Sequence, residues 1–197
     1  MCCSAMLPKI ANTKMLYPAI ENVHRILNNT IDPAVAIANV AEFTGGSEEQ
    51  HDADILISLV NIEEVRLARE QRYVVKIDDE LYPKNPAVHL DLWLLFTAYG
   101  AGYENNIRNL QEVIAFFQKQ PVFRASEIAE LADDGIERLT LELVTLAFEQ
   151  LQQLWSMLGG KYQPSVLYKM RMLTIDSRQE QPVAPIVEVE TILKRKN

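Results

Sequence analysis

The sequence of 197 residues has little cysteine, little histidine and no long hydrophobic run. Its two cysteines, Cys2 and Cys3, are adjacent, so they cannot form the disulfide framework that ties distant segments of small secreted proteins. The longest apolar run, residues 92–96, is far shorter than the roughly 20 residues that span a bilayer. The first residues also lack the basic segment and apolar stretch of a signal peptide. We therefore expect a protein of a reducing cytosol without membrane association.

The sequence also has fewer basic than acidic residues. The sequence has 19 lysines and arginines and 27 aspartates and glutamates, which gives a net charge of -8. This balance argues against a general nucleic-acid-binding protein, because such a protein shows a basic patch or stripe. The 48% hydrophobic and 23% charged residues are ordinary for a globular domain. A chain of this length should fold as one domain without a stabilising metal or disulfide.

Motifs of the common enzyme classes are absent from the sequence. The three histidines, His24, His51 and His89, are scattered, and none has a second histidine or cysteine at the spacing of metal ligands. Neither a glycine-rich phosphate loop nor a nucleophile elbow occurs. His89 and Asp91 would share one face of a strand and could form an acid–base pair, but such a pair is more often a solvent-exposed strand face. The sequence therefore predicts no catalytic residue, no cofactor site and no metal site.

Apolar residues recur every three or four positions in three segments, which predicts amphipathic helices at about 15–28, 103–119 and 147–158. In the second helix we expect the buried stripe to contain Ile107, Leu110, Ile114 and Phe117. The third helix should end at Gly159-Gly160 and bury Trp155. A further short helix is expected within residues 125–135.

Alternating apolar residues predict strands at about 55–62, 88–97, 139–146 and 165–175. A short strand is expected at Val35 and Ile37, with Val40 as a possible last member. Residues 67–77 are ambiguous and could continue a hairpin, and 78–86 reads as a loop with two prolines. In the 55–62 strand we expect two apolar faces, because Ile55, Ile57 and Leu59 alternate with Leu56, Val60 and Ile62. Together these elements predict an α/β (α+β) fold, a mixed sheet with amphipathic helices packed on it.

The pattern of apolar and polar residues changes after residue 177. A linker with Pro182 and Pro185 leads to a segment, 187–193, in which apolar and polar residues alternate again. We therefore expect one domain over residues 1–177 and a linker with an extended C-terminal arm over 178–197. A tail that is disordered or folds on its own domain is the alternative. The candidate inter-subunit residues of the arm are Val187, Val189, Thr191, Leu193, Lys194, Arg195 and Lys196.

Three stretches of the sequence follow one another in the same order as similar stretches in a known protein family. They are 88–100 (VHLDLWLLFTAYG), 110–122 (LQEVIAFFQKQPV) and 139–177 (LTLELVTLAFEQLQQLWSMLGGKYQPSVLYKMRMLTIDS). A strand ends in a TAYG turn, a helix ends before Pro-Val, and a strand, a helix with LW, a YQPS turn and a last strand follow. In this order the chain resembles, over about residues 10–177, the tail-terminator or cap proteins of extracellular contractile injection systems. These are phage-tail-like particles of the virulence-cassette and antifeeding-prophage type.

The resemblance implies a structural protein and not an enzyme. Such caps form a homo-hexameric ring on the end of the inner tube and the contractile sheath, where they stop polymerisation and anchor the last sheath layer. The expected partners are tube and sheath subunits, in the bacterial cytoplasm during assembly and later in a released or cell-held particle. The arm would then add a strand to a neighbouring subunit. Two alternatives stay open, another sheath- or baseplate-associated adaptor of the same particle and a small-molecule enzyme with an unrecognised site.

Overall fold

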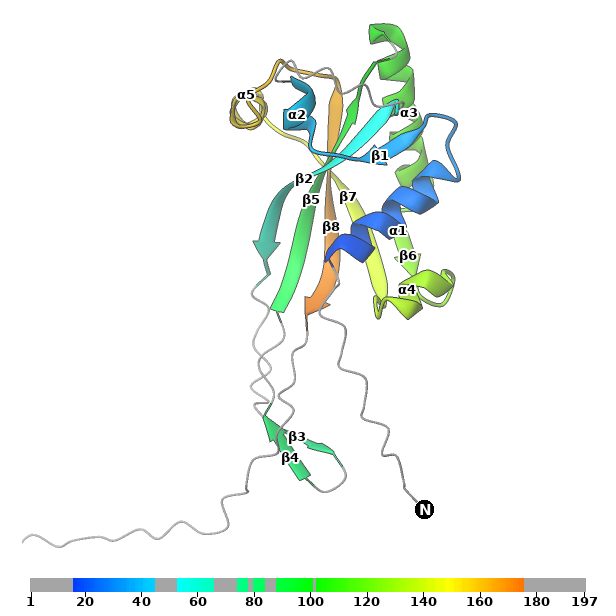
Figure 1. The fold of residues 1–197 in the computed structure, drawn as a ribbon, viewed down its shortest axis with the longest axis vertical. Helices are drawn as coiled ribbons and strands as arrows, with labels where there is room; N and C mark the ends of the chain where they lie inside the picture. The colour runs from blue at the N-terminus through cyan, green and yellow to red at the C-terminus, as the bar shows by residue number, and fades with distance from the viewer. Residues whose placement is uncertain are drawn as a thin grey trace, which may run out of the picture.

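The computed structural model describes residues 16–44, 53–65, 74–77, 80–83, 88–100 and 102–175. They contain one six-stranded mixed sheet with helices on both faces (Figure 1). In spatial order its strands are β1 (Val35–Ile37), β2 (Ile55–Glu64), β5 (Val88–Ala98), β8 (Ser165–Ile175), β7 (Arg138–Val144) and β6 (Val122–Arg124). β1 runs parallel to β2, and every other neighbouring pair is antiparallel. The predicted fold class, a mixed sheet with helices packed on it, is confirmed.

Five helices and a separate two-stranded sheet complete the described part. The helices are α1 (Leu16–Asn28), α2 (Val40–Thr44), α3 (Tyr103–Lys119), α4 (Ala129–Asp133) and α5 (Phe148–Met157). The small sheet pairs β3 (Val74–Ile77) with β4 (Glu80–Pro83) in antiparallel fashion. In the described residues, no helix has the length and apolar character needed to cross a membrane.

Most predicted elements are confirmed, but three assignments differ. Val40 begins α2 and does not continue the first strand. The expected loop at 78–86 contains β4, which pairs back on β3. The short strand β6 follows Pro121 and was not predicted, because three residues are too few to show an alternating pattern. This strand forms because it pairs with β7, and its own sequence has no pattern that predicts it.

The larger part of the core lies between one face of the sheet and helices α1, α3 and α4 (Figure 1). Aromatic rings fill its centre. Phe117 of α3 lies 5.4 Å from Phe96 of β5 and 4.7 Å from Tyr168 of β8, measured between ring centroids. This arrangement explains the strong apolar period of the second half of β5, which is the most completely buried strand segment.

The predicted buried stripe of α3 is rotated at its start. Ile107 is exposed, and the buried positions are Asn106, Leu110, Val113, Phe116 and Phe117. Both Asn106 and Ile107 lie one turn before Leu110, so the helical period alone cannot choose between them. Asn106 is buried although its side-chain oxygen has no hydrogen-bond partner within the described structure.

A second, smaller core covers the upper half of the opposite face. Trp155 of α5 packs there with Val40 of α2, Leu95 of β5 and Leu167 of β8. Only 4% of Trp155 is exposed, so the predicted burial of this residue is confirmed. The helices α2 and α5 thus cover one end of this face, and they leave its other end to the side chains of the strands themselves (Figure 1).

Candidate interaction surface

One margin of the sheet is only partly covered. β1 pairs with β2 at Ile55–Ile57, after which the chain turns into α2. Beyond that point, no strand among the described residues pairs with the outer side of β2, which forms the margin of the sheet (Figure 1). We call the stretch from Leu59 to Glu64 the β2 edge.

Two apolar side chains of the β2 edge lie on the same face of the sheet. Leu59 pairs with Leu94 of β5, and Ile62 pairs with Leu92, two residues away on the same side of that strand. The register shifts between Leu59 and Asn61, where a bulge adds one residue to β2. The expected alternation, with Leu59 and Ile62 on opposite faces, is therefore wrong. Leu59 is 40% exposed and Ile62 46% exposed, so both remain open to a partner.

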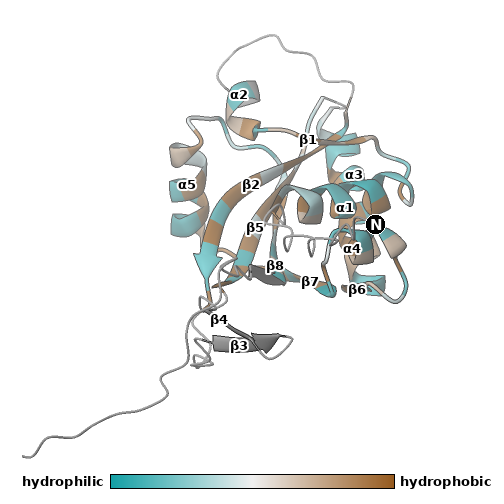
Figure 2. Cartoon of the chain, turned by 60° about the horizontal axis from the view of Figure 1, so that its bottom comes forward, coloured by the Kyte–Doolittle hydropathy of each residue, from teal (hydrophilic) through white to brown (hydrophobic). Residues whose placement is uncertain are grey.

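The β2 edge turns part of its main chain away from β5. The N–H group of Val65 donates a hydrogen bond to the carbonyl oxygen of His89 at 2.8 Å. Because bonded and non-bonded residues alternate in an antiparallel pair, the main-chain groups of Ile62 and Glu64 point away from β5. Figure 2 shows that β2 becomes hydrophilic toward its end.

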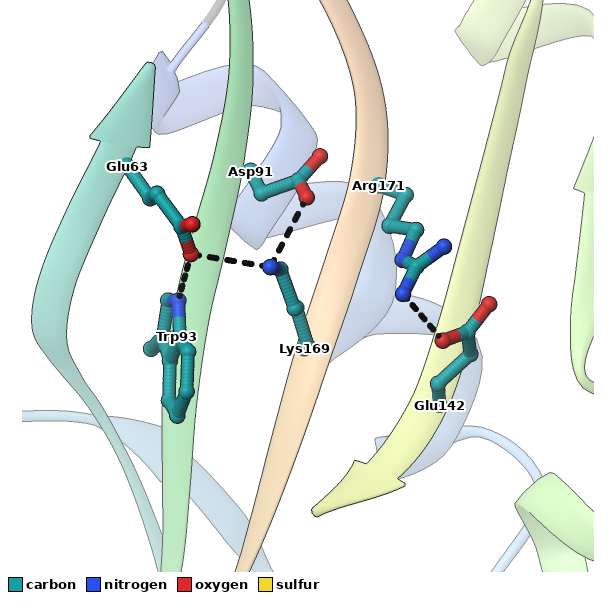
Figure 3. A network of polar contacts seen from close by, with 6 residues as sticks. All are labelled: Glu63, Asp91, Trp93, Glu142, Lys169 and Arg171. Carbon is teal, nitrogen blue, oxygen red and sulfur yellow. Dashed lines mark hydrogen bonds and ion pairs between the residues drawn. The ribbon is translucent and has the colours of Figure 1, made fainter. Parts of the chain in front are cut away.

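Paired charged residues lie on the end of the sheet face that α2 and α5 leave uncovered. We call five of them the ion-pair ladder: Glu63, Asp91, Glu142, Lys169 and Arg171 (Figure 3). Its centre is Lys169 of β8. The ammonium nitrogen of Lys169 lies 2.8 Å from a carboxylate oxygen of Glu63 and 3.1 Å from one of Asp91. Arg171 continues the ladder toward β7 through a 2.9 Å pair with Glu142. The ion pairs of the ladder thus connect the four strands β2, β5, β8 and β7.

Trp93 of β5 fixes the position of Glu63. The indole Nε1 of Trp93 donates a hydrogen bond of 3.1 Å to Glu63, and Lys169 lies 5.3 Å from the centre of the indole ring. The hydrogen bond from Lys169, followed by that from Trp93, holds the pKa of the Glu63 carboxyl below its usual value. In return, Glu63 raises the pKa of Lys169, so the pair stays charged over a wide pH range.

Two of the candidate catalytic and metal residues have other partners in the structure. Asp91 pairs with Lys169, and Nε2 of His24 lies 2.8 Å from the carbonyl oxygen of Val35. Across the described ranges, no group of three or more His, Cys, Asp or Glu residues could hold a metal ion. His51, Cys2 and Cys3 lie outside the described residues. The perturbed pKa values of Glu63 and Lys169 follow from their ion pair, which is a structural one.

A second candidate surface is the outer side of α5. Phe148 is 91% exposed, and Met157 at the other end of the helix is exposed as well. Between them Glu149, Gln152, Gln153 and Ser156 line an open hollow. Exposed aromatic and methionine side chains with few charges are typical of protein interfaces.

The predicted arm residues, Val187, Val189, Thr191, Leu193, Lys194, Arg195 and Lys196, all lie outside the described residues. Sequence reasoning missed the β2 edge, because the bulge that turns Ile62 toward Leu59 depends on pairing with β5. The available signal was Asn61, a polar residue between the apolar residues Val60 and Ile62.

The fold is similar to that of two solved structures of terminator proteins. A chain of the PVC sheath/tube terminator of an extracellular contractile injection system, in the extended state, aligns with a TM-score of 0.54 and 15% identity. A chain of the anti-feeding prophage cap, a tube terminating cap, aligns with a TM-score of 0.58 and 17% identity. At these identities the likeness shows the fold.

The two alignments cover most of this chain but less of the other proteins. They include 94% and 92% of this chain, against 65% and 62% of the PVC and anti-feeding prophage chains. The chain thus spans less than two thirds of either structure. A search of the curated proteins gives no match.

The sequence itself carries the family relationship. The model of the family described as the Pvc16 N-terminal domain matches residues 20–188, which include every element of the six-stranded sheet. This match confirms the resemblance to the terminators of contractile injection systems. The chain therefore belongs to the Pvc16 N-terminal domain family.

Proposed function

We propose that this chain is the structural cap of a contractile, phage-tail-like injection particle. Six copies form a ring on the end of the inner tube and the sheath, where the ring stops polymerisation and anchors the last sheath layer. Assembly takes place in the bacterial cytoplasm, and the cap then stays in the released or cell-held particle. The cap works by binding and not by catalysis.

The family match over residues 20–188 carries the proposal. The fold supports it, since both structures compared above are described as terminators or terminating caps. The surface agrees with a role in assembly, because it offers two candidate contact regions, the β2 edge and the outer side of α5. A closed ring needs two different patches on each subunit, one of which meets the other on the next copy.

The domain of residues 1–177 and the arm of residues 178–197 have separate tasks in this proposal. The domain builds the body of the ring, and the arm joins one copy to the next through Val187, Val189, Thr191 and Leu193. Lys194, Arg195 and Lys196 meet acidic groups of the neighbour, since the chain is acidic overall. Exposed ion pairs are worth about 0–1 kcal/mol each, so the strand contributes more than the charges.

Two measurements test the ring and its target. Native mass spectrometry of the purified chain should show six copies, about 134 kDa for a subunit of 22.4 kDa, alone or when tube subunits are present. Gold-labelled chain mixed with preformed tubes and sheaths should bind at one end in electron micrographs. A monomer in every mixture, or a label distributed along the tube, would refute the proposal.

A further inference from the structure

We propose that residues 1–15 bind to an apolar patch on the six-stranded sheet of their own domain and cover it. The patch, which we call the sheet patch, consists of Leu59 and Ile62 of β2 and Val88 and Leu90 of β5. This inference concerns a single copy of the chain, so it does not rest on the proposed cap function. It names the segment that completes the cover of one face of the sheet.

The residues of the sheet patch lie next to one another on the same face. Ile62 pairs with Leu92 of β5, and Leu90 follows Leu92 on that face, so Ile62 and Leu90 are diagonal neighbours. Val88 extends the patch along β5, and Leu59 extends it along β2. Leu59 and Val88 are each 40% exposed, and Ile62 is 46% exposed. A contiguous group of exposed apolar side chains of this kind marks a contact surface.

Helix α1 covers the neighbouring part of the same face. Its buried side belongs to the core that includes Leu92 and Leu94, and Leu90 of the patch packs against that core. Leu16, the first residue of α1, is partly buried against the same core. In Figure 1 the start of α1 lies over β8, and no helix of the described part lies over the lower halves of β5 and β2. The chain therefore enters the helix close to the sheet patch.

The sequence of residues 1–15 suits an apolar patch on an acidic domain. Met6, Leu7 and Ile10 lie close together along the chain, and the segment contains no acidic residue. Lys9 and Lys14 give it a charge of +2, so the rest of the chain carries -10 of the total of -8. Burial of the apolar side chains and attraction between opposite charges both favour contact of the segment with its own domain.

The segment is long enough to reach the sheet patch. β2 lies two strands away from β8, which is about 10 Å at roughly 4.8 Å per strand. Residues 8–15 can span up to about 28 Å when extended, at 3.3–3.6 Å per residue. A path to the outer side of α5 would have to pass around the sheet, because α5 packs on the opposite face.

Attachment beside the patch favours the segment over other occupants. A peptide on a short connection has an effective concentration of about millimolar at its site, which exceeds the concentration of most free partners. A second copy or another subunit of a particle would therefore have to displace residues 1–15 before it could bind Leu59 and Ile62. A neighbouring copy that met the β2 edge would meet this segment as well.

Thiol labelling of the full chain measures whether the segment covers the patch. In a background with Cys2→Ser and Cys3→Ser, Ile62→Cys places a single thiol in the sheet patch. The comparison variant adds Leu7→Asp and Ile10→Asp, which remove the apolar contacts of the segment. The thiol should react with a maleimide at least tenfold more slowly when Leu7 and Ile10 are present. Equal labelling rates would overturn the inference.

A matched control separates cover of the patch from a general effect of the substitutions. Phe148→Cys places the thiol on α5, on the opposite face of the sheet, where Phe148 is 91% exposed. Its labelling rate should be the same with and without Leu7→Asp and Ile10→Asp. A change equal to that of Ile62→Cys would contradict the assignment of the segment to the sheet patch.

Engineered disulfides identify which chain supplies the segment. In the same cysteine-free background, Ile62→Cys is combined with Leu7→Cys or with Ile10→Cys. On mild oxidation, at least one variant should form a fast-migrating monomer on non-reducing gels, at least tenfold sooner than the same positions paired with Phe148→Cys. No bond in either variant, or equal rates for both partners, would overturn the inference. Covalent dimers would also overturn it, because the segment would then come from a second copy.

The outcomes separate this inference from the proposed function. Protection of the Ile62→Cys thiol that appears only at high protein concentration would assign the sheet patch to a second copy. Protection that requires added tube or sheath subunits would assign it to those subunits. Either result would overturn the cover by residues 1–15, whereas the proposed cap function would stand in both cases.

Discussion

Glu63 of β2 and Lys169 of β8 form an ion pair of 2.8 Å across the strand β5 that separates them. Lys169 reaches Asp91 of the intervening strand at the same time, at 3.1 Å (Figure 3). These contacts tie three strands together on a part of the sheet that α2 and α5 leave uncovered. They also hold β2 in place beside β5.

Removal of Lys169 should destabilise the domain. Asp91 is only 8% exposed and Lys169 16%, whereas Glu63 reaches solvent. Breaking a buried pair costs about 3–5 kcal/mol and an exposed one about 0–1 kcal/mol, so Lys169→Met should cost about 2 kcal/mol. The control Arg171→Met breaks an exposed pair and should cost under about 1 kcal/mol. Urea unfolding measures both, and equal losses would contradict the central role of Lys169.

The contribution of Glu63 should depend on pH. Lys169 and Trp93 hold the pKa of Glu63 below its usual value of 4.5, so the carboxylate stabilises the folded state above that pH. This contribution is lost as the pH falls through the lowered pKa. Glu63→Gln should therefore unfold at lower urea than the parent near neutral pH, and the difference should shrink as the pH falls below 4.5. A difference that is constant or grows in acid would contradict the assignment.

Tyr168 should make the protein sensitive to alkali. Burial raises the pKa of its hydroxyl from 10.0 to about 12. Between these values the unfolded chain loses this proton and the folded protein keeps it, so stability falls as the pH rises. Tyr168→Phe retains the ring that packs on Phe96 and Phe117. Its urea midpoint should fall less steeply from pH 10 to 12, and parallel curves would refute the burial argument.

The smaller core should depend on Trp155. Truncation of a buried aromatic residue costs about 3–5 kcal/mol, a large share of the roughly 5–15 kcal/mol that stabilise a domain. Trp155→Ala should therefore lower the melting temperature by roughly 10 °C or yield little folded protein. The control Phe148→Ala, on the exposed side of the same helix, should change it by only a degree or two. Similar melting temperatures for both variants would show that α5 faces the other way.

The sequence predicted the elements that have a strong period of their own. The ranges of α3, α5, β5 and β8 agree with their alternating or helical patterns, and Trp155 is buried as expected. Each of these segments packs a continuous apolar face against the sheet or its helices. The spacing of their apolar residues therefore predicts both the type of element and its buried side.

The remaining features depend on contacts between segments. The bulge at the β2 edge arises in the pairing with β5, and β6 exists through its pairing with β7. The burial of Asn106 in place of Ile107 depends on how α3 meets the sheet. The ion-pair ladder joins residues as distant as Glu63 and Lys169, which no spacing along the chain could bring together. The predicted arm lies beyond the described residues and remains a prediction.

The length distribution of particles tests the proposed cap most directly. Tube, sheath and baseplate subunits of the same particle would be produced in bacteria with and without this chain, and the particles measured by electron microscopy. With the chain, lengths should fall in one narrow peak, with labelled chain at one end. Without it, tubes and sheaths should be long, variable and open at that end. Particles of the same narrow length in its absence would contradict the cap function.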